Sequence, residues 1–241
     1  MDELRVEAIT SVIRSDPSYH PADAFADDRY LAGLISDVEN IADRLGVSAT
    51  DLRYLRLDQD GSVADRALSR VTAVADPQPL YVARSGIETD PFVAFLPTLV
   101  HDHPSVTDAL VLTHLEALSG SAIFEFLSWS MSPAGAALLL VDEQVVTTES
   151  ALPPKLSAVA MRVHPGPGGT QVSAWGTGSP PTSKGSVHIT GRRSCDAWLG
   201  FTRAVASDDV RAGDVVVLHT RDDAQEGWVQ LQVDALPVLL P

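Results

Sequence analysis

The chain has 241 residues, of which 45% are hydrophobic and 20% charged, as expected of a globular protein with a sizeable core. Its formal net charge is −15, so repulsion from phosphate groups argues against nucleic acids and anionic membrane surfaces as partners. Cys195 is the single cysteine, which excludes an intramolecular disulfide and a cysteine-based metal site and fits a reducing cytoplasm.

The amino terminus and the hydrophobic runs show no sign of targeting or membrane insertion. The first residues, MDELRVEAITSV, include acidic side chains and no long apolar core, which argues against a signal peptide. No run approaches the roughly 18 apolar residues of a membrane-spanning helix. We therefore expect a cytoplasmic protein.

The first part of the chain predicts alternating strands and helices. Strands are expected at residues 4–13, 78–84, 109–115 and 136–141, and helices at residues 28–45, 61–73, 91–100 and 121–129. Ser62 is a suitable N-cap for the second helix, and Pro97 is expected to interrupt or end the third. The near-continuous apolar run at 136–141 is typical of a strand that is covered on both faces. This alternation indicates an α/β protein with a mostly parallel sheet.

The second part of the chain predicts more strands and fewer helices. After a polar linker at residues 147–154, strands are expected at 157–163, 170–175, 187–190, 214–219 and 228–233, with a helix at 194–206. Each part ends in a helix that is followed by a hydrophobic strand, so the two parts are expected to be related. We place the boundary at residue 150, which gives one half at 1–150 and a shortened half at 151–241.

The most informative segment is residues 109–126, ALVLTHLEALSGSAIFEF, which predicts a buried strand, a tight turn and an amphipathic helix. The turn contains Ala117-Leu118-Ser119-Gly120. It resembles the Ala-Cys-Ser/Ala-Gly elbow of thiolase-like condensing enzymes, in which the cysteine accepts the acyl group. A leucine at that position cannot form a thioester.

Two further segments extend this resemblance to the 3-oxoacyl-acyl-carrier-protein synthase III (KAS III) family of the thiolase superfamily. Residues 157–178, SAVAMRVHPGPGGTQVSAWGTG, resemble the start of the family's C-terminal half. Residues 191–233 resemble its Gly-Asn-Thr-Ser segment, the next helix and the last two strands, most clearly in VRAGDVVVL at 210–218. The resemblance implies an α/β, thiolase-like layered αβαβα fold of two related halves, with the second half shortened.

The same resemblance implies that the catalytic groups are lost. The family needs an activated cysteine at a helix N-terminus, a histidine and an asparagine that stabilise an oxyanion, and a glycine-rich loop beside the pocket. Here the cysteine position holds Leu118, the asparagine position holds Arg192, and the loop reads RDDAQEG at 221–227. Few residues separate the strand ending at Trp175 from Arg192, so the histidine segment is expected to be missing. No catalytic residue, cofactor or metal is therefore predicted.

Several residues near the elbow are weaker candidates. Ser119 could act as a nucleophile only with a neighbouring base, and we expect Ser119 and Ser121 to cap the helix instead. Cys195 could be a reactive thiol at a helix start, but no partner histidine is evident, so packing is the expected role. Arg192 and Arg193 could bind the phosphate or pantetheine arm of a carrier or coenzyme A, although a surface pair is the simpler interpretation.

Histidines are also weak candidates. His101-Asp102-His103 has side chains that suit a metal but lacks a third ligand, so a solvated loop is expected. His164 lies in the HPGPGG connection and is not assigned to catalysis. His114, in the predicted strand before the elbow, is expected to lie in the core or in an interface.

Thiolase-like enzymes are dimers in which the strand before the elbow pairs across a two-fold axis, so the resemblance implies an interface along that strand. The candidates for this interface and for the pocket are Phe92, Val111, Thr113, His114 and Leu115. The implied partner is a catalytically competent KAS III-like subunit, possessing the cysteine, histidine and asparagine. An acyl carrier protein or acyl-CoA would be reached through that partner.

The resulting hypothesis is a non-catalytic subunit of a heteromeric KAS III-like condensing enzyme or acyltransferase. It would complete the dimer and the acyl pocket of the partner in fatty-acid-like or polyketide-type secondary metabolism. Two alternatives stay open. One is a stand-alone acyltransferase or thioesterase that uses a serine near the elbow, with Ser119 as the weak candidate. The other is a scaffold homodimer that binds an acyl ligand without reacting.

Overall fold

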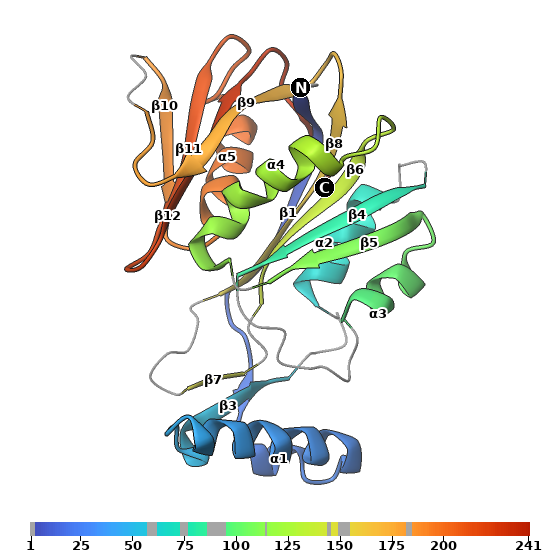
Figure 1. Ribbon diagram of the computed structural model, residues 1–241, viewed down its shortest axis with the longest axis vertical. Helices are drawn as coiled ribbons and strands as arrows, with labels where there is room; N and C mark the ends of the chain where they lie inside the picture. The colour runs from blue at the N-terminus through green and yellow to red at the C-terminus, as the bar shows by residue number, and fades with distance from the viewer. Residues whose placement is uncertain are drawn as a thin grey trace.

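The computed structural model describes residues 3–56, 62–72, 77–85, 95–113, 115–143, 146–148, 155–181 and 185–241, which form a mixed α/β fold (Figure 1). One large sheet has the strand order β10-β11-β12-β9-β1-β8-β6-β4-β5, with β13 paired to β1, and a small sheet has the order β2-β3-β7.

The large sheet consists of β1 (Leu4–Arg14), β4 (Gln78–Arg84), β5 (Val106–Leu112), β6 (Ala136–Asp142), β8 (Leu156–Pro165), β9 (Thr170–Thr177), β10 (Val187–Gly191), β11 (Val215–Arg221), β12 (Glu226–Gln232) and β13 (Val238–Leu239). The small sheet consists of β2 (Tyr19–His20), β3 (Leu52–Leu55) and β7 (Val146–Thr148). The helices are α1 (Arg29–Arg44), α2 (Val63–Thr72), α3 (Phe95–Asp102), α4 (Ser119–Ser130) and α5 (Asp196–Ala206), with short 3-10 turns η1 (Ala22–Phe25), η2 (Ala49–Asp51) and η3 (Glu116–Leu118).

The large sheet contains two related parts. In the five-strand part, β5, β4 and β6 are parallel, and β8 and β1 continue the sheet through antiparallel pairs. In the four-strand part, β10 and β11 are parallel, and β12 and β9 continue it through antiparallel pairs. β1 and β9 join the two parts where Leu4–Val6 pair with residues 170–172.

Among the residues that the structure describes, the four-strand part lacks one strand of this pattern. Helix α4 connects β5 to β6, and β4 lies between those two strands; α5 connects β10 to β11, which are direct neighbours. The missing strand falls in the short connection between β9 and β10. This agrees with the expected shortening of the second half.

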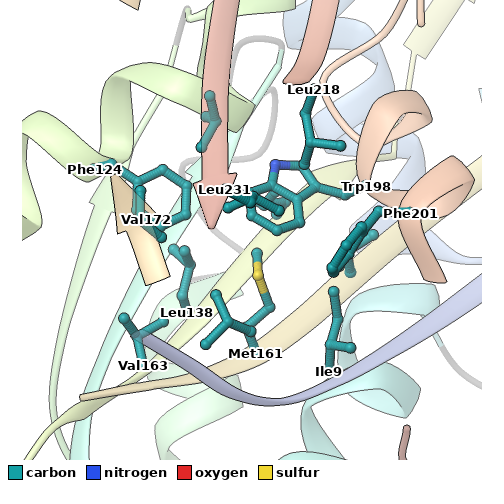
Figure 2. Close-up of a cluster of buried hydrophobic side chains, with 14 of the residues drawn as sticks. Ile9, Phe124, Leu138, Met161, Val163, Val172, Trp198, Phe201, Leu218 and Leu231 are labelled. Carbon is teal, nitrogen blue, oxygen red and sulfur yellow. The ribbon is translucent and has the colours of Figure 1, made fainter. Parts of the chain in front are cut away.

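The helices α4 and α5 lie between the two parts of the sheet (Figure 1). The larger core joins their side chains to the inner faces of both parts; Figure 2 shows Phe124, Trp198 and Phe201 from the helices against strand residues such as Met161 and Leu231. The second core lies between the other face of the five-strand part and α2 and α3. The order of layers is therefore helix, sheet, helix, sheet.

The outer face of the four-strand part is adapted to solvent. Along β12, Gly227, Val229 and Leu231 are buried, whereas the residues between them are only partly buried. Such alternation is typical of a sheet with one solvated face. The helices packed on β9–β12 in the described part of the chain are α4 and α5, both on the inner face. The shortening of the second half thus also affects its outer helical layer.

Most of the elements predicted from the sequence are confirmed within a few residues. Ser62 caps α2 as expected, because its Oγ accepts a hydrogen bond from the Asp65 N–H at 3.0 Å. Pro97 neither interrupts nor ends a helix: it occupies the first turn of α3, where a missing N–H leaves no broken bond. The small sheet and β13 were not predicted.

The strand before the elbow was placed three residues too late. β5 spans Val106–Leu112, and not 109–115, because the Val106 N–H bonds to the His103 carbonyl and starts the strand shortly after α3.

His114 and Phe92 lie outside the described residues. The domain boundary at residue 150 stays a prediction.

The first prediction concerns the close contact between β10 and α5. A Cβ added at Gly191 would lie 2.8 Å from the Ala197 nitrogen and would also clash with the Asp196 Cβ. We expect Gly191→Ala to lower the free energy of unfolding by about 1–3 kcal/mol, measured by urea unfolding.

Gly33→Ala in α1 is the matched control, because nothing lies within 4 Å of the added Cβ. It should raise stability by about 0.5–1 kcal/mol through helix propensity. Equal stability of the Gly191 variant and the native chain would contradict the contact.

Candidate functional site

The predicted elbow is a sharp turn in which η3 runs directly into α4. Glu116 has a φ of 41°, a left-handed conformation that is uncommon for a residue other than glycine. Its N–H donates to the Ser85 carbonyl at 2.9 Å, which attaches the turn to the end of β4. The strand, turn and helix predicted from the sequence are therefore present.

Leu118 packs against the hairpin formed by β11 and β12. A Cβ added at Gly227 in β12 would lie 2.9 Å from Leu118 Cδ2 and would clash with the Ser121 hydroxyl. The hairpin backbone can approach this closely only because residue 227 is a glycine. The position predicted for the nucleophile thus holds a hydrocarbon side chain in contact with the opposing strand.

The first turn of α4 also contacts α5. A Cβ at Gly120 would lie 2.6 Å from the Ser194 carbonyl oxygen, so the glycine of the elbow is required by packing. Trp198 Nε1 donates to the Gly120 carbonyl at 3.0 Å, and the Phe124 and Trp198 rings stack with centroids 5.6 Å apart.

The hydroxyls near the elbow donate to the backbone. Ser119 Oγ donates to the Glu116 carbonyl at 2.9 Å, and Ser121 Oγ donates to the Leu118 carbonyl at 3.1 Å. The sequence predicted capping of N–H groups, whereas both hydroxyls close the turn by bonding to carbonyls. A nucleophilic serine instead gives its proton to a base. In the described part of the chain, neither hydroxyl bonds to a histidine or carboxylate side chain.

A buried carboxylate connects β6 to the start of α5. Asp142 accepts hydrogen bonds from Ser194 Oγ at 2.5 Å and from the Cys195 N–H at 2.8 Å. The next residue, Glu143, accepts a 3.3 Å bond from the Val63 N–H at the start of α2. Successive side chains of an extended chain point to opposite faces, so these two carboxylates reach helix N-termini in two different layers.

Cys195 is fully buried beside Asp142. Burial raises the pKa of the Cys195 thiol well above its usual value, and the neighbouring carboxylate raises it further. Since the thiolate is the reactive form, this environment favours the packing role over the reactive thiol.

Arg192 and Arg193 precede α5, and Asp196 organises them. The backbone N–H groups of both arginines donate to Asp196 Oδ2, at 3.2 and 3.0 Å, and Lys155 pairs with the same carboxylate at 2.7 Å. Burial alone would raise the pKa of Asp196, but Lys155 and the two N–H groups outweigh it, so the pKa is lowered. The Arg192 side chain is exposed, and its role as an anion ligand stays a prediction.

The interface candidates that the structure describes pack against different hydrophobic cores. Val111 in β5 packs against the core under α3, and Leu115 packs against the core around α4 and α5. Thr113 is half-buried between them. Phe92 and His114 cannot be placed, since neither belongs to the described residues.

An apolar patch at the β5 edge extends these candidates. β5 is the last strand of the large sheet, and Leu110 on it is 38% exposed and pairs with Tyr81 across the strands. The Tyr81 ring contacts the Phe126 ring at 5.8 Å, and Phe126 contacts Trp129, which is 70% exposed, at 4.5 Å. We call Leu110, Tyr81, Phe126 and Trp129 the edge patch. The sequence did not single out Leu110.

In the His101-Asp102-His103 motif, one histidine is buried and the other is exposed. His103 is buried and bonds to Asp65 at 2.9 Å and to Thr72 at 3.3 Å, whereas His101 and Asp102 are exposed. No group of three or more His, Cys, Asp or Glu side chains suited to a metal occurs among the residues that the structure describes. The described helices also include none long and apolar enough to cross a bilayer.

Neither a family model nor a curated protein matches this chain by sequence. Solved structures match it in fold. The 3-oxoacyl-(acyl carrier protein) synthase III FabH from Pseudomonas aeruginosa PAO1 aligns over 99% of this chain and 100% of its own, with a TM-score of 0.59 and 15% identity. A variant of OleA from Xanthomonas campestris covers 95% and 98%, with a TM-score of 0.62 and 8% identity.

The tetronic acid condensing enzyme AbyA1 covers 95% of this chain and 99% of its own, with a TM-score of 0.60 and 10% identity. These likenesses show that the fold is thiolase-like, as the sequence predicted.

The second prediction tests the buried thiol. Because Cys195 is buried and its pKa is raised, we expect iodoacetamide at pH 8 to leave the folded chain unmodified and to alkylate it fully in denaturant, as measured by intact mass. Ser173→Cys, at an exposed position of β9, is the control and should be alkylated once in the folded state. Rapid alkylation of the native chain would contradict this placement.

Proposed function

We propose that this chain is a non-catalytic subunit of a heteromeric condensing enzyme or acyltransferase of the KAS III type. One observation carries the proposal. Leu118, which the resemblance places at the position of the acyl-accepting cysteine, packs against the Gly227 backbone. The side chain that contacts β12 from the elbow is therefore one that cannot form a thioester.

The surroundings of Leu118 support loss of the chemistry. The nearby serine hydroxyls donate to carbonyls, and Cys195 is buried with a raised pKa. The described residues of the four-strand part include no strand where the resemblance predicts loss of the histidine segment. Arg192, which the resemblance places at the asparagine position, has an exposed side chain and no amide group.

The edge of the large sheet supports a partner subunit. Among the described residues, β5 is the last strand of the large sheet, and such edges readily pair with another strand. The edge patch places exposed Leu110 and Trp129 beside it. A catalytically competent subunit that pairs here would gain main-chain hydrogen bonds and would cover these side chains.

The substrate setting is part of the proposal. The matched structures include proteins named as a 3-oxoacyl-(acyl carrier protein) synthase III and a tetronic acid condensing enzyme. By analogy, the complex would act on acyl groups carried by an acyl carrier protein or coenzyme A in fatty-acid-like or polyketide-type secondary metabolism. The partner would supply the cysteine, histidine and asparagine, and this chain would complete its dimer and the wall of its acyl pocket.

The third prediction tests the partner. Co-expressed with a cysteine-containing KAS III-like subunit from the same genome, the chain should co-purify as a stable heteromer. Leu110→Lys should weaken that association by about tenfold or more, because it buries a charge at the edge.

Leu236→Lys is the matched control, since Leu236 is also 38% exposed but lies outside the edge patch. It should leave co-purification unchanged. Failure to bind any such subunit, or equal effects of the two substitutions, would sink the proposal.

The fourth prediction separates this role from a serine enzyme. Incubated alone with acyl-CoA, the chain should show no covalent acyl adduct by intact mass spectrometry, because the Ser119 hydroxyl donates to the Glu116 carbonyl. Ser119→Ala is the comparison variant and should behave identically. An adduct that disappears in the Ser119→Ala chain would favour a stand-alone acyltransferase or thioesterase.

A further inference from the structure

Helix α1 forms the outer layer of the small body built on β2, β3 and β7. Figure 1 shows it at the end of the molecule farthest from α4 and α5, with the small sheet on one side. The Asp28 carboxylate accepts a bond from the Leu31 N–H at 3.1 Å at its start, and Gly46, with a φ of 75°, follows its end. Both ends of the helix are therefore well defined.

One face of α1 packs on the small sheet. Ile35 and Ala42 are buried there together with Leu52 and Tyr54 of β3. These contacts account for a single apolar face, as expected for a helix that covers one side of a sheet.

A second apolar stripe runs along α1 beside the first. Its members recur at alternating intervals of three and four residues: Leu31, Leu34, Val38, Ile41 and Leu45. Ile41 is 57% exposed and Leu45, just after the helix, is 76% exposed. This spacing is that of the contact seam between two helices packed side by side. Val38 also packs against the core of the small sheet, whereas the contacts with that sheet leave Ile41 and Leu45 exposed.

Charges beside the stripe indicate what would cover it. Asp37 and Arg44, both exposed, lie seven residues apart on the flank away from the small sheet, at equivalent positions of the repeat. In two antiparallel copies of α1 related by a two-fold axis, Asp37 of each copy faces Arg44 of the other. Two reciprocal ion pairs then flank the apolar seam, as a self-complementary interface requires.

We propose that α1 is a docking surface for a second copy of this chain, with the two α1 helices packed antiparallel through the Leu31–Leu45 stripe. A parallel arrangement would bring Asp37 toward Ala42, which offers no ion pair. The surface is separate from the β5 edge. Binding through both would assemble two copies of this chain and two partner subunits.

The first experiment uses the full chain carrying Leu110→Lys, so that pairing through β5 does not contribute. Native mass spectrometry and sedimentation should give twice the mass of the 25.7 kDa chain. Adding Ile41→Glu and Leu45→Glu should leave monomer only, because both charges would be buried in the seam. Ser36→Glu, at an exposed position of α1 outside the stripe, is the control and should stay dimeric.

The second experiment exchanges the charges. Asp37→Arg alone and Arg44→Asp alone should each weaken the dimer by about tenfold, because each places like charges in both flanking pairs. An equimolar mixture of these two variants should form mixed dimers, and the double variant Asp37→Arg, Arg44→Asp should return to native affinity. These outcomes would distinguish the antiparallel pairing from non-specific hydrophobic association.

Several results would overturn the inference. They are a monomeric Leu110→Lys chain, a dimer that survives Ile41→Glu and Leu45→Glu, or a double charge exchange no stronger than the single substitutions. Loss of the KAS III-like partner in the Ile41→Glu, Leu45→Glu chain, or stripe-dependent co-sedimentation with neutral phosphatidylcholine vesicles, would assign the stripe to another occupant. Failure of the β5 proposal alone would leave the dimer in place.

Discussion

The contact between the first turns of α4 and α5 is the constraint on which the large sheet and its helices depend. Gly120 allows the Ser194 carbonyl to come close, Trp198 donates to the Gly120 carbonyl, and the Phe124 and Trp198 rings stack beside it. Since each helix also covers the inner faces of both sheet parts, any shift at this contact would disturb the largest core. The elbow is therefore held in place by packing, with or without a nucleophile.

This constraint explains how the described residues can form the fold with four strands in one part of the sheet and no helix packed on the outer face of that part. The strands that border α4 and α5 are kept in both sheet parts, and the shortening affects the connection between β9 and β10, away from the helix contact. The outer face of β12 carries polar residues such as Gln230 between buried apolar ones, so it needs no covering helix. Asp142 adds a buried connection between β6 and the start of α5.

Two surfaces of the molecule lie apart from the elbow. The β5 edge with Trp129 and the α1 stripe with Ile41 lie on different bodies of the molecule, so two partners could be bound at once. The two surfaces also differ in kind. The first offers the edge of a sheet, and the second offers a helical seam whose flanking charges complement their own copy.

The sequence by itself determined the α/β class, the strand–turn–helix at Leu118, and most helices and strands, because hydrophobic periodicity and an N-cap such as Ser62 are local signals. It also located the shortening, since chain length between two motifs is directly countable. Local patterns could not give the small sheet, whose strands are two to four residues long and pair across distant segments. Only the tertiary structure decided that Gly227 meets Leu118, that Asp142 reaches α5, and that Leu110 and Ile41 face outward. Each of these depends on which distant segments become neighbours, and burial of one side chain is a property of the neighbours that cover it.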